Sequence, residues 1–188
     1  MSAQGQLLGQ ILLMLDEVEI PHMVVGSLAS SFHGEPRQTR DIDIVIDPEP
    51  DALRRLVDML PTEQLYADAG AATEALERRT SFNVIELDTG WKVDFIMRRN
   101  RPFSHEELSR RIPVHLLGTR VYVATAEDTI IAKLEWATGG QSERQLRDVA
   151  AILETQGDGL DQAYLNRWLR ALDLDDAWER AQQLTEPS

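Results

Sequence analysis

Two aspartates are the residues whose type and spacing best suit chemistry. Asp41 and Asp43 lie two positions apart in the β-branched run DIDIVI of residues 41–46. Alternate residues of a strand project from one face, so the sequence predicts that these carboxylates lie side by side. Two carboxylates this close repel each other unless a cation lies between them. Oxygen ligands of this kind favour Mg²⁺ or Mn²⁺, held by carboxylates together with substrate phosphates.

A glycine–serine pair precedes the two aspartates. Gly26 and Ser27 follow the apolar run 23–25, and a short helical pattern over 28–33 comes next. Glycine allows a tight turn and close approach of a ligand. The start of a helix presents unpaired N–H groups, which together with the Ser27 hydroxyl can bind a phosphate oxygen. The pair and the aspartates together indicate half of a metal-dependent phosphoryl-transfer site, with a nucleotide as the source of the phosphates.

The same residues carry a resemblance to a known superfamily. Val25-Gly26-Ser27 followed by Asp41-Ile42-Asp43-Ile44 resembles the signature of the polymerase-β-like nucleotidyltransferases. Members of that superfamily carry a third carboxylate on a later, neighbouring strand. The resemblance implies that Asp94, within the strand-like segment 91–97, is the third metal ligand and the best candidate for a base toward the acceptor.

A narrower likeness extends over most of the chain. The sequence is similar to bacterial nucleotidyltransferases of the AbiEii toxin type, and the segments that carry the likeness are 39–44, 92–95, 127–128, 132–136 and 142–148. In those toxins a lysine and an aspartate of later motifs belong to the active site. Lys133, Arg147 and Asp148 match these motifs loosely. On this match the resemblance implies a catalytic role for Lys133 and a nucleotide-binding role for Asp148, and it gives Arg147 no role.

Each basic residue near these motifs could either bind a phosphate or balance the charge of nearby acidic residues. Arg37 and Arg40 flank the acidic strand and could receive a triphosphate or an RNA backbone, or could simply balance nearby acidic residues. Lys133 lies on the flank of the apolar stripe in a helix that Thr125 is predicted to cap. Its ammonium could reach a phosphate or pair with an acidic residue one turn away. Either Lys133 or Arg40 could offset negative charge that develops during transfer.

Composition narrows the function classes. The chain has 188 residues, no cysteine and a net charge of −13. The missing cysteines exclude disulfides, thiolate metal sites and a cysteine nucleophile. The negative charge opposes broad attraction to nucleic acid. No basic apolar leader or long apolar span is evident, which favours a cytoplasmic protein with no membrane association.

The expected fold is of the α/β (α+β) class, namely a nucleotidyltransferase fold with a mixed β-sheet flanked by helices and a C-terminal helical extension. We expect a catalytic core over 1–124 and a helical region over 125–188 packed on that core. The predicted strands are 22–25, 41–46, 82–87, 91–97, 113–117 and 120–124, and the predicted helices before residue 126 are 5–17, 28–33, 50–60, 71–78 and 104–111.

The resemblance implies transfer of a nucleoside monophosphate from a nucleoside triphosphate to an acceptor hydroxyl of RNA, tRNA or protein. It also implies a toxin of a toxin–antitoxin or abortive-infection system with a cognate antitoxin, and a homo-oligomer is compatible with it. Two alternatives stay open. One is a non-catalytic nucleotide-binding or antitoxin-like protein, and the other is an aminoglycoside-type enzyme, for which an acidic pocket would suit a cationic acceptor.

Overall fold

The computed structural model describes residues 2–140 and 142–185, and its contacts divide these residues into two units. The sheet unit contains the chain up to Val25 and the stretch Thr39–Val123. The helical unit contains Gly26–Gln38 and the chain from Ala124 onward. Each unit is therefore built from two separate stretches of sequence.

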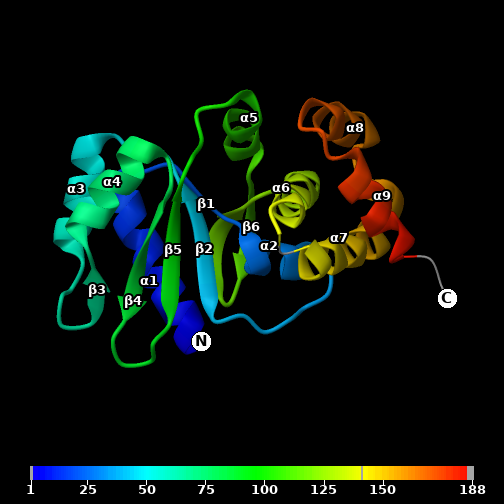
Figure 1. Ribbon diagram of the computed structural model, residues 1–188. Coiled ribbons are helices and arrows are strands. Elements are labelled where there is room, and N and C mark those ends of the chain that lie inside the picture. Colours follow the sequence, from blue (N-terminus) through cyan, green and yellow to red (C-terminus); the bar gives the residue numbers. More distant parts are fainter. Residues whose placement is uncertain (1, 141, 186–188) are drawn as a thin grey trace. The chain divides into compact units, whose positions relative to one another are not determined.

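The sheet unit is organised around a mixed seven-stranded sheet in the order β3-β4-β5-β2-β1-β7-β6. Its strands are β1 (His22–Val24), β2 (Asp41–Ile46), β3 (Leu65–Ala67), β4 (Ser81–Glu86), β5 (Lys92–Met97), β6 (Ile112–Leu116) and β7 (Thr119–Val123). β2 pairs in parallel with β5, and β1 pairs in parallel with β7, while the other neighbours are antiparallel. Figure 1 shows β5 and β2 side by side in the middle of this sheet.

Side chains alternate between a buried and a more polar face over the first half of β2, and the alternation ends at Val45, which is buried on the face of the aspartates. Ile42, Ile44 and Ile46 are fully buried, whereas Asp41 is exposed and Asp43 is partly exposed. The same alternation holds in β5, where Val93, Phe95 and Met97 are fully buried. Removal of these apolar side chains from water is the main contribution to the stability of this unit.

Helices complete the sheet unit. They are α1 (Ala3–Glu17), α3 (Pro50–Met59), α4 (Ala69–Arg78) and α5 (Pro102–Arg110). The α1 helix contributes one apolar face to the core, with Leu8, Ile11 and Leu15 fully buried. The α3 helix begins with a proline, which is favoured in the first helical turn because its missing N–H would have no partner there.

The helical unit contains α2 (Gly26–His33), α6 (Ala126–Thr138), α7 (Ser142–Gln156), the 3₁₀ turn η1 (Gly157–Gly159), α8 (Gln162–Ala171) and α9 (Asp175–Gln183). The α2 helix packs on both α6 and α7. The predicted cap at Thr125 is confirmed, because its hydroxyl oxygen accepts a hydrogen bond from Asp128 N. The Asp128 side chain is fully buried and accepts hydrogen bonds from the hydroxyls of Thr125 and Tyr164.

The predicted fold class is confirmed, since the sheet is mixed and helices accompany it. Strand β3 was not predicted from the sequence. It consists of three residues that pair with β4, and so short a strand has too little alternation to be recognised. Among the described residues, no helix is both long and apolar enough to cross a membrane.

Candidate functional site

The parallel pairing of β2 with β5 brings three predicted site residues together in the sheet unit. Asp43 lies directly opposite Asp94, and Asp41 lies opposite Lys92. Residues opposite each other in neighbouring strands project from the same face, so the three aspartates share the polar face. Asn83 of β4 lies opposite Asp94 on its other side. We call Asp41, Asp43, Asp94 and Lys92 the carboxylate face.

Lys92 is the cation of the carboxylate face. Its Nζ lies 2.8 Å from Asp94 Oδ2 and 3.9 Å from Asp41 Oδ1. The hydrogen bond to Asp94 raises the pKa of Lys92 above its ordinary value; partial burial opposes this, and the charges of the neighbouring carboxylates add to the rise. The ammonium therefore offsets part of the repulsion that three neighbouring carboxylates would otherwise have.

The donor set of this face fits a hard divalent cation. Its oxygen atoms come only from carboxylates, which suit Mg²⁺ or Mn²⁺, and the strand register places Asp43 beside Asp94. Within residues 2–140 and 142–185, however, no three His, Cys, Asp or Glu side chains are gathered closely enough to hold a metal ion as they stand. Metal binding at this face would thus require the side chains, Lys92 included, to rearrange around the ion.

A second set of predicted site residues meets in the helical unit around Asp148. Lys133 Nζ donates to Asp148 Oδ2 at 2.6 Å. Arg37 donates from Nε to Oδ1 and from Nη2 to Oδ2, each at 3.2 Å. Arg37 Nη2 also donates to the Ser27 hydroxyl oxygen, and the Ser30 hydroxyl donates to Asp148 Oδ2 at 3.4 Å. We call these five residues the Asp148 cluster.

Electrostatics explains how a lysine can be buried in this cluster. The side chains of Lys133 and Asp148 are 7% and 10% exposed. Burial alone would raise the pKa of Asp148, but the hydrogen bonds and charges of Lys133 and Arg37 outweigh it, so the pKa lies below its ordinary value. The Asp148 carboxylate therefore holds two cationic side chains, those of Lys133 and Arg37, in place.

The remaining predicted residues have simpler surroundings. Gly26 begins α2 with a φ of 62°, a left-handed conformation that favours glycine. Arg40 is exposed in the sheet unit. Arg147 pairs with Glu143 on an exposed face of α7 at 3.2 Å.

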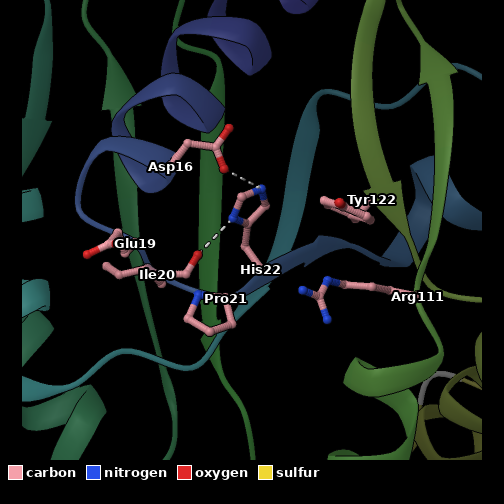
Figure 2. A pocket seen from close by; sticks show the side chains of 7 residues that line it. All are labelled: Asp16, Glu19, Ile20, Pro21, His22, Arg111 and Tyr122. Atoms are coloured by element: carbon pink, nitrogen blue, oxygen red, sulfur yellow. Dashed lines mark hydrogen bonds and ion pairs between the residues drawn. The ribbon is translucent and has the colours of Figure 1, made fainter.

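Each unit has a hollow in its surface. In the helical unit a hollow of about 450 Å³ is lined by Arg37, Arg144, Arg147, Ser30 and Asp148, among others, so it borders the Asp148 cluster. Figure 2 shows the hollow of the sheet unit, about 190 Å³, where the His22 ring lies near Asp16 and Tyr122 while Arg111 lies over Tyr122.

The hollow of Figure 2 is distant from the carboxylate face along the strands. β1 runs antiparallel to β2, and His22 lies opposite Ile46, at the other end of β2 from Asp41. His22 makes a hydrogen bond of 2.9 Å with the Ile20 carbonyl through Nδ1, which fixes the orientation of its ring. We therefore assign His22 a structural role.

Comparison with known families identifies the chain. Residues 26–187 match the family model described as nucleotidyl transferase AbiEii toxin, type IV TA system. The chain belongs to this family. The protein is accordingly a nucleotidyltransferase, as the sequence resemblance predicted, and the family is one of toxin–antitoxin systems. No curated protein sequence matches the chain.

Solved structures share the fold of this nucleotidyltransferase at low identity. An antigenic nucleotidyltransferase-like protein from Paracoccidioides brasiliensis is 16% identical with a TM-score of 0.58, over 94% of this chain and 92% of that chain. ANT(2")-Ia in complex with adenylyl-2"-tobramycin is 14% identical with a TM-score of 0.61, over 90% and 97%. The lincosamide antibiotic adenylyltransferase LnuA, with lincomycin bound, is 10% identical with a TM-score of 0.53, over 80% and 96%.

Sequence reasoning missed two members of these sites. Lys92 is one of only two lysines in the chain and lies two residues before Asp94, so alternation alone would have placed it on the same face. Ser30 gave no comparable signal, because its contact with Asp148 joins residues 118 positions apart.

Proposed function

We propose that this nucleotidyltransferase transfers a nucleoside monophosphate from a nucleoside triphosphate to an acceptor hydroxyl, with the carboxylate face as its metal-binding centre. The observation that carries the proposal is the register that places Asp43 beside Asp94, with Asp41 on the same face. These three aspartates would hold Mg²⁺ or Mn²⁺, and a bound ion would stabilise negative charge on the phosphoryl oxygens.

The protein's own residues have separate tasks in this proposal. Asp94 is the candidate to accept the proton of the attacking hydroxyl, because it is partly exposed and lies on the same face as Asp41 and Asp43. Arg40 is exposed and can approach a phosphate from the sheet unit.

In the helical unit we propose a phosphate-binding role for the Asp148 cluster. The Gly26 turn begins α2, and Ser27 follows it in the first helical turn, where free N–H groups can bind an anion. Arg37 donates to the Ser27 hydroxyl oxygen, so a guanidinium is fixed beside that turn. Asp148 then acts as a positioning residue, since its carboxylate holds Arg37 and Lys133 rather than contacting a phosphate itself.

For the acceptor we propose RNA, tRNA or protein, with the enzyme acting as the toxin of a toxin–antitoxin pair. The family description supports the toxin role. A small-molecule acceptor is the second candidate, because the fold is shared with ANT(2")-Ia and LnuA and the net charge of −13 suits a cationic acceptor. The complete set of carboxylates argues against a purely non-catalytic, antitoxin-like protein.

The test is a transfer assay with each α-labelled nucleoside triphosphate, Mg²⁺ or Mn²⁺, and separate acceptor fractions of total RNA, cell protein and an aminoglycoside panel. Label should move to one fraction with the wild type and not with Asp43→Asn. The matched control is Asp58→Asn, which removes an exposed carboxylate from α3 of the same unit and should transfer normally. Equal transfer by Asp43→Asn and the wild type would exclude the proposed centre.

A further inference from the structure

Lysine is rare in this chain, and both lysines lie against carboxylates. Lys92 and Lys133 are the only lysines among nineteen basic residues. Lys133 is buried with Asp148, which makes it a fixed part of its unit. Lys92 differs because its side chain is 38% exposed, so its ammonium can move without opening a packed core.

The Lys92 ammonium lies where it would meet a metal ion bound by the aspartates. Its Nζ lies between carboxylates of two different strands, 2.8 Å from Asp94 Oδ2 and 3.9 Å from Asp41 Oδ1. A divalent ion that binds these carboxylates must take oxygen atoms with which the ammonium interacts. Two cations at such a short distance also repel each other, so the ammonium and the metal ion cannot both lie between Asp94 and Asp41.

We propose that Lys92 is an intramolecular counter-ion that competes with the divalent ion for Asp94 and Asp41, and that it thereby lowers the metal affinity of the enzyme. The inference rests on the proposed function, which assigns the metal to this face. In the metal-free enzyme the ammonium limits repulsion among the aspartates. On metal binding it leaves Asp94 and turns toward solvent.

A lysine suits this exchange better than an arginine. An ammonium is a single point charge on a flexible stem, whereas a guanidinium binds a carboxylate with two parallel hydrogen bonds. An arginine at position 92 would therefore release Asp94 less readily. Methionine and arginine at position 92 should therefore affect metal affinity differently.

The experiment measures Mn²⁺ affinity by isothermal titration calorimetry on the full-length protein, without nucleotide. Lys92→Met keeps the length of the stem and removes the charge, and it should bind Mn²⁺ roughly five- to tenfold more tightly than the wild type, as expected for one partly screened charge at this distance. Lys92→Arg should bind no more tightly than the wild type. Arg54→Met is the control, since it removes a positive charge from an exposed helix position of the same unit.

A second measurement uses the unaltered protein. Labelling with ¹⁵N-lysine yields only two side-chain ammonium signals, and Lys92→Met assigns them. Addition of Mg²⁺ should shift the Lys92 signal and leave the Lys133 signal in place. An unmoved Lys92 signal at saturating Mg²⁺, or a Lys92→Met variant that binds Mn²⁺ no more tightly than Arg54→Met, overturns the inference and leaves the proposed function intact. Absence of Mn²⁺ binding by both the wild type and Lys92→Met overturns both.

Discussion

Lys133 Nζ and Asp148 Oδ2 lie 2.6 Å apart, and each side chain is at most one-tenth exposed. Removal of one member of such a pair leaves a buried charge without its main partner. We expect Asp148→Ala to lower the free energy of unfolding by about 3 kcal/mol, measured by urea denaturation.

The control for this prediction removes both charges. Lys133→Met combined with Asp148→Leu replaces the pair with apolar side chains, and it should recover more than half of the lost stability because buried ion pairs often add little net stability themselves. A double variant as unstable as Asp148→Ala would show that Asp148 contributes mainly through Arg37 and Ser30.

Asp94 should be essential for transfer and dispensable for folding. It is a partly exposed residue on the polar face of β5, so Asp94→Asn removes a charge without creating a cavity. The rate of transfer should fall on the order of 10² to 10³, the usual effect of losing one electrostatic contact in an active site. Thermal melting should change little. Undiminished transfer by this variant would remove Asp94 from the site.

A side chain at Gly34 is predicted to destabilise the protein. A Cβ at this position would lie 2.9 Å from Ile152 N and 3.0 Å from the Ala151 carbonyl carbon, both backbone atoms that cannot turn aside. Gly34→Ala should therefore destabilise the protein by about 1 to 3 kcal/mol through overpacking. Gly159→Ala is the matched control in the same unit, because its Cβ would meet nothing within 4 Å. Equal urea midpoints for the two variants would contradict the predicted clash.

Stability should depend on pH through His33. Burial lowers the pKa of His33 below its ordinary value of 6.5, despite opposing effects of its hydrogen bond to Ala124 and the charge of Glu127. Its Nε2 lies 2.7 Å from the Ala124 carbonyl oxygen, to which it donates. The folded protein therefore favours the neutral ring, and below pH 6.5 the unfolded chain binds more protons. The contribution of His33 to the free energy of unfolding is therefore complete above pH 6.5 and is lost as the pH falls below that value.

The measurement is the urea midpoint of the wild type and His33→Gln from pH about 8 down to about 5. The variant should lack the part of the decline that the wild type shows below pH 6.5. His115→Gln, which changes an exposed histidine of β6, should keep the wild-type profile. If the urea midpoint of His33→Gln declines with pH as much as that of the wild type, other titratable groups cause the decline.

Local patterns explain what the sequence predicts well and what it does not. The alternation in β2 and β5 is a property of adjacent residues, so the strands and the shared face of Asp41 and Asp43 are readable from the sequence. The partners of Asp148, in contrast, do not follow from local spacing. Tertiary packing brings Arg37 and Lys133 to its carboxylate. No local rule predicts partners 111 positions apart.

The separation of α2 from the helices on which it packs has a consequence for how the chain folds. Leu28, Ala29 and His33 of α2 are buried, and α2 packs on α6 and α7, which lie about a hundred residues further along the chain. As a ribosome extends the chain, α2 emerges early and must wait for α6 and α7 before its apolar side is covered. Formation of the helical unit therefore requires closure of a long loop, which slows folding. Until then this short helix is a candidate for chaperone binding.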